Sequence, residues 1–347
     1  MMKKKILVGI LIAFTLFLIL FASYYFYSLT PVNKNNKNEI VFIVEPGMSK
    51  IEIAKKLKKS GVIKSKNTLL IYLFFNSDLS LQAGKYSLNK SMSPSDILKK
   101  FHKGDIKVET TTVRFGEGKR LKEYVALISQ EFGYDEDEII SVINDKKFLN
   151  EMINKYWFLT DSILNDNIYY GLEGYIFPDT YEFMSNEGIE EIFVRVLNYT
   201  DQKLSMYKNL IEKSNYSVHD IITMASIIEL EANSKEDRQK VSQVIYKRME
   251  YNMSLGMDVT TYYATQKEMG DVLTYSDLVS GNPYNTRNTN KIGLPVGPIC
   301  NPSLESIEAV FEPSDTDYLY FYADIKTGLV YFAKTSAEFN QIIKEVG

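Results

Sequence analysis

Apolar residues form one unbroken stretch near the N-terminus, from Ile6 to Phe26, with no charged side chain among them. As a helix rising about 1.5 Å per residue, this stretch reaches about 30 Å, the thickness of the hydrocarbon core of a bilayer. Tyr24 and Tyr25 lie near its far end, where membrane helices often carry aromatic residues. The pattern predicts a transmembrane anchor within residues 1–28.

The charges around this stretch predict its orientation. Lysines at positions 3 to 5 precede it, and basic residues gather on the cytoplasmic side of membrane helices. We therefore expect a single-pass protein of the cell membrane, with a cytoplasmic N-terminus and an extracytoplasmic body. A cleaved signal peptide is the alternative, but the apolar run is longer than usual and its end is a poor cleavage site.

Polar residues from 29 to 39 predict a flexible linker, and residues 40–133 then alternate short β-prone runs with helices. Ser49 stands three residues before Glu52, the spacing of a capping box, and Ser93 precedes a helix with proline at its first position. The pattern indicates two small α+β units in this region.

From residue 134 to 347 the pattern is mainly helical. Helices are predicted to begin after the capping residues Ser217 and Ser234, and a β-hairpin that turns near Gly328 is followed by a terminal helix after Ser336. The predicted fold class is therefore α+β, with an N-terminal transmembrane helix, small α+β units and then a mixed α+β domain.

Composition excludes several classes of function. The net charge of −4 comes from 40 basic and 44 acidic residues that are well interspersed, so no basic surface for nucleic acid is expected. A single cysteine, Cys300, and two distant histidines, His102 and His219, do not suggest a disulfide framework, a metal cluster or a Cys/His nucleophile. We expect no metal and no cofactor.

The stretch ITMASIIELEA places a carboxylate among isoleucines. Apolar residues at 221, 222, 225 and 228 follow the spacing of a core-facing helix, and Glu229 occupies the next position of that stripe. Glu231 is roughly 200° further round the helix, so we expect it in solvent. A carboxyl group removed from water favours its uncharged form, which a general acid requires. The alternative is a structural carboxylate satisfied by a helix-end amide, by Arg248 or by another base.

Several loops supply polar side chains that suit a saccharide. LGMDVTTYYA, NPYNTRNT and GLPVGPICNP follow the glutamate helix, and each is ordinary turn chemistry when taken alone. Together they suggest a cleft. The earlier stretch YYGLEGYIFPDTYEF mixes aromatic residues with Glu173 and Asp179, which either line a sugar site or pack a domain junction.

The motifs LEGYIFPDTYEF, ASIIELEA, MDVTTYYA, PYNTRNTNKIGLPVGPICNP and YLYFYAD resemble, in order and spacing, the YceG-like endolytic murein transglycosylases (MltG). The resemblance covers nearly all of the chain beyond the anchor. It implies a LysM-like α+β region within residues 40–133 and a catalytic domain over residues 134–347 that cuts nascent peptidoglycan strands internally. It also implies work near peptidoglycan synthases of the elongation or division machinery.

By this resemblance, Glu229 would protonate the oxygen that links N-acetylmuramic acid (MurNAc) to N-acetylglucosamine (GlcNAc). It would then accept the proton of the muramyl C6 hydroxyl, leaving a 1,6-anhydro end without consuming water. An internal hydroxyl in place of water explains why one acid is enough. The residues expected to bind the glycan are Ser226, Asp258, Thr260, Tyr284, Asn285, Thr286, Pro298, Asn301, Glu173 and Asp179.

The sequence departs from the family pattern at a few places. Val259 replaces a proline, Val330 and Phe339 replace histidines, and the turn Phe115 to Gly118 differs mildly. Two other functions stay open: a non-catalytic peptidoglycan-binding scaffold of the wall-synthesis machinery, and a muramidase that uses water.

Overall fold

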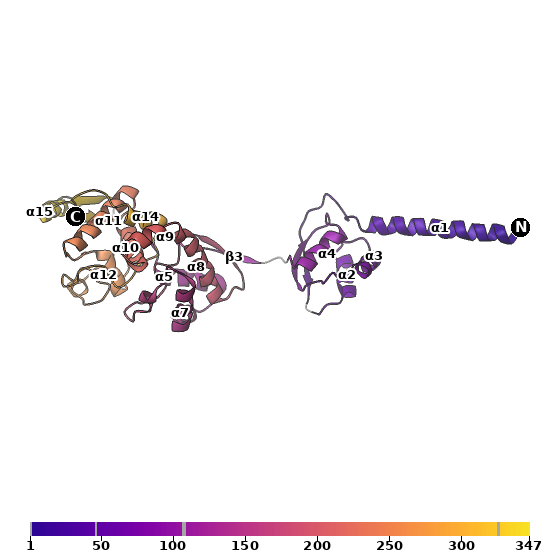
Figure 1. Ribbon diagram of the computed structural model, residues 1–347, viewed down its shortest axis with the longest axis horizontal. Helices are drawn as coiled ribbons and strands as arrows, with labels where there is room; N and C mark the ends of the chain where they lie inside the picture. The colour runs from indigo at the N-terminus through magenta and orange to yellow at the C-terminus, as the bar shows by residue number, and fades with distance from the viewer. Residues whose placement is uncertain (1, 46, 106–108, 325–326) are drawn as a thin grey trace. The chain divides into compact units, whose positions relative to one another are not determined.

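The computed structural model describes residues 2–45, 47–105, 109–324 and 327–347 (Figure 1). The chain divides into two compact units, Met1–Glu109 and Thr110–Gly347, each with its own hydrophobic core. We refer to them as the N-terminal unit and the C-terminal unit. The α+β class predicted from the sequence is confirmed.

The N-terminal unit begins with the long apolar helix α1. Val8–Ser28 has a mean hydropathy of 2.2 and is long enough and apolar enough to cross a membrane. The ammonium group of Lys64 donates to the Tyr27 carbonyl at 3.2 Å and to the Thr30 hydroxyl at 2.7 Å, so the end of the helix is tied to the domain that follows.

A two-stranded antiparallel sheet and three helices make up the rest of this unit. The sheet pairs β1 with β2, and Phe42 lies opposite Tyr86. Ser49 forms the predicted capping box with Glu52, and Ser93 caps the helix that begins at Pro94. The elements are α1 (Met2–Ser28), β1 (Ile40–Val44), α2 (Lys50–Lys59), α3 (Lys66–Phe75), β2 (Gly84–Leu88) and α4 (Pro94–Lys103).

The C-terminal unit contains two further two-stranded antiparallel sheets and most of the helices. Its elements are β3 (Thr110–Arg114), α5 (Leu121–Phe132), α6 (Glu136–Ile143), α7 (Lys146–Lys155), the 3-10 helix η1 (Asp161–Leu164), β4 (Thr180–Met184), α8 (Ile189–Ser205), α9 (Lys208–Lys213), α10 (Val218–Glu231), α11 (Lys235–Glu250), α12 (Asp258–Thr265), α13 (Tyr275–Leu278), α14 (Leu304–Phe311), β5 (Tyr320–Ala323), β6 (Val330–Ala333) and α15 (Ser336–Val346).

The boundary between the units differs from the one expected after residue 133. Strand β3 pairs with β4, which comes about seventy residues later, so that Thr110 lies opposite Met184. Helix α5 packs on β3, and its residues Leu121, Tyr124 and Val125 are fully buried in the C-terminal core. Long-range strand pairing therefore assigns residues 110–133 to the C-terminal unit.

Helix α10 lies at the centre of the C-terminal core, where it packs against α11, α12 and α14. Ser217 caps it as predicted, through a capping box with Asp220. Every residue from Ile221 to Ile228 is buried, including the polar Thr223 and Ser226. The helix is therefore buried on all sides and has no solvent-facing stripe along this stretch.

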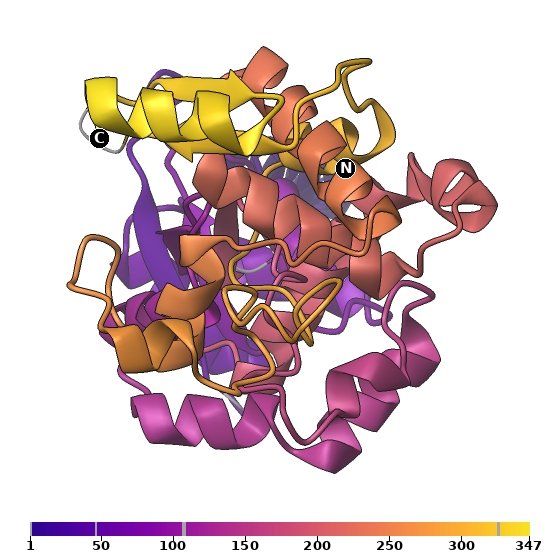
Figure 2. The same ribbon diagram turned by 90° about the vertical axis from the view of Figure 1, so that its left-hand side faces the viewer.

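The predicted C-terminal hairpin and terminal helix are both present. Strands β5 and β6 pair antiparallel, and Thr335 caps α15. Figure 2 shows this yellow hairpin and helix above the orange segments that follow α11, on the same side of the C-terminal unit.

Candidate active site

The last turn of α10 opens onto a cavity in the C-terminal unit. This cavity has a volume of about 810 Å³ and lies among the ends of α10 and α11, the segment from Met253 into α12, β5 and α15. We call it the main cavity. Glu231, the final residue of α10, lines it together with Asp258.

The carboxyl group of Glu231 is partly buried in the wall of the main cavity and is not held by any other residue that the structure describes. Within the described ranges, no hydrogen bond or ion pair reaches it. Burial and, to a smaller extent, the nearby Asp258 raise the pKa of Glu231 to about 8, although Arg287 and Arg248 oppose the shift. Glu231 therefore holds a proton near neutral pH and can donate it.

Two arginines provide fixed positive charge beside the main cavity. The Nε group of Arg287 donates to Asp258 Oδ1 at 2.5 Å, so Asp258 is already engaged in an ion pair. Arg248 donates to the carbonyls of Leu319 at 2.6 Å and Leu255 at 2.5 Å. These contacts tie the end of α11 to the residue before β5 and to the segment before α12.

Aromatic side chains cover much of the remaining wall. Tyr262, Tyr320, Tyr322 and Phe339 all line the main cavity, and Tyr320 stacks on Phe339 at 5.6 Å between ring centroids. Aromatic faces bind the apolar faces of sugar rings, while their polar edges hydrogen-bond hydroxyl groups. The cavity therefore combines one free acid with surfaces that suit a saccharide.

Glu229 lies on the other side of α10 and has a full set of partners. Its Oε2 atom accepts hydrogen bonds from the Ser303 amide at 3.0 Å, the Ser303 hydroxyl at 2.5 Å and the Ser306 hydroxyl at 2.6 Å. Arg238 approaches Oε1 at 3.5 Å, and 7% of the Glu229 side chain is exposed. Ser303 is the N-cap of α14, so Glu229 holds the positive end of that helix.

Glu229 is shielded from water as predicted, with 7% of its side chain exposed, whereas the environment of Glu231 differs from the prediction. Glu231 was expected in solvent, but it lines the main cavity and its pKa is raised. Glu229 instead matches the structural alternative, a carboxylate satisfied by a helix-end amide, with Arg238 as the base rather than Arg248. The helical stripe did not predict the position of Glu231, because α10 is buried on all sides up to Ile228 and so has no solvent-facing side there.

Most of the predicted glycan-binding residues are buried away from both cavities. Asp258 lines the main cavity, and Asp179 lines a second cavity described below. The other eight are buried: Ser226, Thr260, Tyr284, Asn285, Thr286, Pro298, Asn301 and Glu173.

Some of these buried residues fix the segments that carry cavity residues. The Thr286 hydroxyl accepts a hydrogen bond from the Met257 amide at 3.1 Å and lies 2.8 Å from the Thr260 hydroxyl. The side-chain amide of Asn285 donates to the carbonyls of Leu278 and Ser280, each at 3.0 Å. Asp258 and Arg287 are therefore adjacent in sequence to a rigid polar network.

Asn301 and Glu173 connect distant parts of the core. Asn301 Oδ1 accepts from the Gly174 amide at 3.0 Å, and its Nδ2 group donates to the Lys119 carbonyl at 3.0 Å. Glu173 accepts from the Leu121 amide at 2.8 Å and from Tyr263 at 2.9 Å, and is 1% exposed. Burial raises the pKa of Glu173 to about 8, but it does not line either cavity.

Pro298 and Ser226 serve close packing. A Cβ atom at Gly174 would lie 2.5 Å from Pro298 Cβ, and Gly174 has a φ of +85°, so this approach requires glycine. The Ser226 hydroxyl accepts a hydrogen bond from the Ile299 amide at 3.1 Å. The loop that contains the motif GLPVGPICNP therefore packs against α10.

Three residues of the main cavity, Glu231, Arg248 and Arg287, were not predicted to belong to a site. A glutamate at the last position of an otherwise buried helix was the available signal for Glu231. Two departures from the family pattern, Val259 and Phe339, also line the main cavity, whereas the residue at 330 does not. Among the described residues, no group of three or more His, Cys, Asp or Glu side chains is arranged to hold a metal ion.

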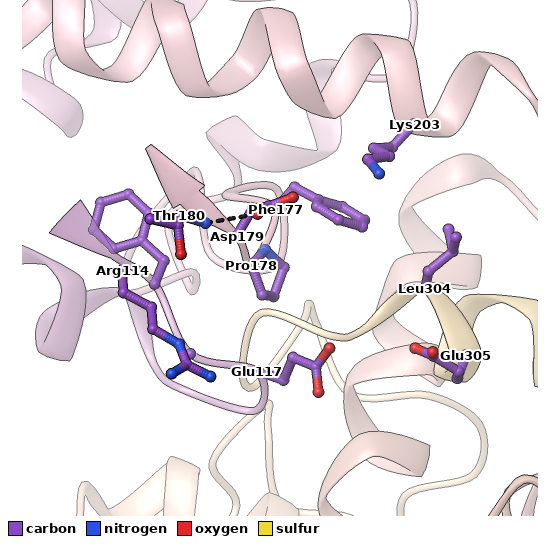
Figure 3. A pocket seen from close by; sticks show the side chains of 11 residues that line it. Arg114, Glu117, Phe177, Pro178, Asp179, Thr180, Lys203, Leu304 and Glu305 are labelled. Carbon is purple, nitrogen blue, oxygen red and sulfur yellow. Dashed lines mark hydrogen bonds between the residues drawn. The ribbon is translucent and has the colours of Figure 1, made fainter. Parts of the chain in front are cut away.

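The second cavity has a volume of about 470 Å³ and lies between the turn after β3, the segment leading into β4, α8 and the start of α14 (Figure 3). We call it the side cavity. Asp179 on its wall accepts hydrogen bonds from Tyr199 and from the Thr180 amide, and these contacts lower its pKa.

The chain belongs to the YceG-like family, whose model matches residues 42–345. An endolytic murein transglycosylase from Bacillus subtilis (strain 168) is 37% identical over 316 residues, covering 90% of this chain and 86% of that protein. A protein of the same name from Streptococcus pneumoniae (strain R6) is 30% identical over 334 residues, covering 92% of this chain and 60% of that protein.

A solved structure has the same fold. The crystal structure of a YceG-like protein from Listeria monocytogenes superposes with a TM-score of 0.63 at 34% sequence identity. The match covers 88% of this chain and 99% of the Listeria chain.

Glu229→Gln is expected to destabilise the protein, because it removes charge-assisted hydrogen bonds to α14 and the attraction to Arg238. We expect the free energy of unfolding to fall by about 1–3 kcal/mol, measured by denaturant unfolding. Glu236→Gln is the matched control, since Glu236 pairs with Lys240 at the surface. An equal loss in both variants would contradict the structural role of Glu229.

Glu231→Gln is expected to stabilise the protein at alkaline pH. Glu231 has a pKa of about 8 in the folded state and an ordinary value of 4.5. Its buried carboxyl group therefore does not lower the free energy of unfolding below about pH 4.5, but lowers it increasingly as the pH rises towards 8. Glutamine removes this loss. Thermal melts should show equal stability near pH 4 and an advantage of about 1–3 kcal/mol for the variant near pH 9.

Glu173 titrates in the same range, but it is present in both proteins and cancels in the comparison. A difference between the two proteins that does not change with pH would mean that Glu231 has no raised pKa.

Proposed function

We propose that this chain is a membrane-anchored endolytic lytic transglycosylase, which cleaves peptidoglycan between MurNAc and GlcNAc and leaves 1,6-anhydroMurNAc ends. Membership of the YceG-like family and the relatives named endolytic murein transglycosylase support the enzyme class. The mechanism rests on one observation: the carboxyl group of Glu231 lies in the main cavity with a pKa near 8 and has no hydrogen-bond or ion-pair partner among the described residues. Glu231 is therefore the catalytic residue that we propose, and the assignment to Glu229 from the family resemblance stays the alternative that the digestion below tests.

In the first step, Glu231 acts as a general acid. Its carboxyl proton passes to the glycosidic oxygen while the bond between that oxygen and C1 of MurNAc breaks. The oxygen leaves as the 4-hydroxyl group of GlcNAc. A pKa near the working pH suits this step, because the acid is largely protonated and still releases its proton readily.

In the second step, the same group acts as a general base. The Glu231 carboxylate accepts the proton of the muramyl C6 hydroxyl as O6 forms a bond to C1. The products are a 1,6-anhydro ring and a regenerated carboxylic acid, so atoms and protons balance without water. The intramolecular attack needs no second carboxylate to activate a water molecule.

The surroundings of Glu231 support a single-acid mechanism. Asp258 is the other acid on the wall of the main cavity, and Arg287 holds it in an ion pair at 2.5 Å. An ion-paired carboxylate is a weaker base and nucleophile than a free one, although its charge still stabilises a positively charged sugar ring. This arrangement favours the transglycosylase over a muramidase that uses two carboxylates.

The location of the enzyme is part of the same proposal. Helix α1 has the length and hydropathy of a single membrane span, and the lysines before it favour a cytoplasmic N-terminus. The two folded units would then face the peptidoglycan. We propose that the N-terminal unit is a LysM-like module that positions the C-terminal unit on glycan strands near peptidoglycan synthases.

Digestion of purified peptidoglycan tests the assignment of the acid. The wild-type protein should release fragments with 1,6-anhydro ends, Glu231→Gln should lower the rate at least about 100-fold, and Glu229→Gln should retain turnover per folded molecule. Mass spectrometry of the fragments is the measurement. Full activity of Glu231→Gln, or its loss in well-folded Glu229→Gln alone, would contradict the assignment.

The mass of the new ends separates the two alternatives. A muramidase leaves reducing ends heavier by one water molecule. A non-catalytic scaffold sediments with wall material and creates no new ends.

The pH dependence of cleavage is expected to have its alkaline limb near the pKa of Glu231. As the pH rises through about 8, the acid loses its proton in the free enzyme, so kcat/KM should fall about tenfold for each further pH unit. Initial rates on uncross-linked glycan strands across the pH range are the measurement. A rate that stays flat up to about pH 10 would show that Glu231 does not supply the proton.

A further inference from the structure

The side cavity carries charged side chains that do not neutralise one another. Arg114 and Lys203 supply two positive charges, and Glu117, Glu305 and Asp179 supply three negative charges. Within the described ranges, the side chains of Arg114, Glu117 and Glu305 form no hydrogen bond or ion pair. Asp179 accepts a hydrogen bond from Tyr199, and the Lys203 ammonium group lies 5.0 Å from the centroid of the Tyr199 ring. Charged groups that share a cavity and remain unpaired are available to a ligand.

Figure 3 shows how these side chains are arranged. The carboxylates of Glu117 and Glu305 point towards each other across the cavity, from the turn after β3 and from the first turn of α14. The ammonium group of Lys203 projects from α8 on the side of Phe177, and Arg114 lies on the far side of Glu117. The cavity therefore has a negative centre with positive groups at its edges.

The two carboxylates influence each other. Burial raises the pKa of Glu117, and the charges of Glu229 and Glu305 raise it further, against the opposing effect of Arg238 and Arg114. Like charges that face each other without a cation between them are relieved when a cation binds. A ligand ammonium group between Glu117 and Glu305 would supply that charge.

The walls of the side cavity are held in place by the core. The Gly118 amide donates to the Asn301 carbonyl at 3.0 Å, and Tyr124 donates to the Gly116 carbonyl at 2.6 Å, so the turn that carries Glu117 is fixed at both ends. Glu229 fixes the start of α14, which carries Glu305. A site with fixed walls loses little conformational entropy when a ligand binds.

The side cavity also lies close to the main cavity. A Cβ atom at Gly118 would lie 3.5 Å from Leu230 and 3.6 Å from Glu229 Cγ, and Leu230 lines the main cavity. The turn at Gly118 therefore packs against the same end of α10 that presents Glu231. A ligand that occupies both places would need a branch.

Murein has such a branch. Each MurNAc unit carries a peptide stem with free carboxylates and, on its diamino acid, an amine that is a free ammonium group until cross-linking converts it to an amide. We propose that the side cavity binds this stem in its uncross-linked form, with the ammonium group between Glu117 and Glu305 and the stem carboxylates facing Lys203 and Arg114. This inference rests on the proposed function, because it assumes that the main cavity takes the glycan strand.

Binding of this kind would select for new strands. A cross-link removes the positive charge that the two glutamates attract and attaches a second peptide that a cavity of about 470 Å³ does not enclose. Recently made strands, whose stems still carry the free amine, would then be preferred over the mature wall.

A single MurNAc residue bearing a tripeptide stem is the probe for this site, because it contains no glycosidic bond that the enzyme can cut. Calorimetric titration of the full-length protein should show binding at least about tenfold tighter for the free-amine probe than for the same probe acetylated on that amine, a change of about 1.4 kcal/mol. The Glu117→Gln/Glu305→Gln double variant should reduce this ratio to near one.

Glu312→Gln is the matched control, since Glu312 caps the other end of α14. It should leave the ratio of affinities unchanged. Equal affinity of the wild type for both probes, or an undiminished ratio in the double variant, would overturn the inference.

Cleavage of glycan strands stripped of their stems separates this inference from the proposed function. The double variant should cut stripped strands at the wild-type rate, and Glu231→Gln should not cut them. A double variant that fails on stripped strands would place Glu117 or Glu305 in the cleavage chemistry and contradict a role limited to stem binding. Loss of cleavage activity altogether would refute the proposed function while the probe titration still reports on the side cavity.

Discussion

The contact between the Glu229 carboxylate and the start of α14 is the interaction on which the rest of the site depends. Three hydrogen bonds from Ser303 and Ser306 converge on one oxygen, and the helix presents its positive end to the same charge. A nearly buried carboxylate is costly unless its lone pairs are satisfied, and here they are. The contact joins α10 to α14 and so fixes one wall of the side cavity while it orients the last turn of α10.

Two glutamates separated by one residue therefore have opposite tasks because they face opposite sides of one helix. Glu229 is held by protein groups and organises the structure, whereas Glu231 faces the main cavity without a partner among the described residues and keeps its proton. The two glutamates of one short motif can thus be explained by two different physical requirements. In this chain, packing accounts for the first glutamate, and we propose that proton transfer accounts for the second.

Local patterns predicted much of the fold. The caps at Ser49, Ser93 and Ser217, the C-terminal hairpin and the apolar N-terminal helix follow from neighbouring residues, and all are present. The pairing of β3 with β4 depends on residues far apart in sequence, so the boundary between the units could not be read locally. The candidate site was harder, because polar residues of recognisable motifs, such as Asn285 and Asn301, satisfy buried backbone groups instead of facing the cavity. A helical-wheel count also cannot show that a helix is buried on every side.

A crystal structure of the Glu231→Gln protein with an uncross-linked murein tetrasaccharide tests the central claim most directly. The account predicts that the strand occupies the main cavity with the oxygen between MurNAc and GlcNAc within hydrogen-bond distance of the substituted side chain, while Glu229 keeps its contacts with α14. A strand bound with that oxygen against Glu229, and the start of α14 displaced from it, would contradict the account.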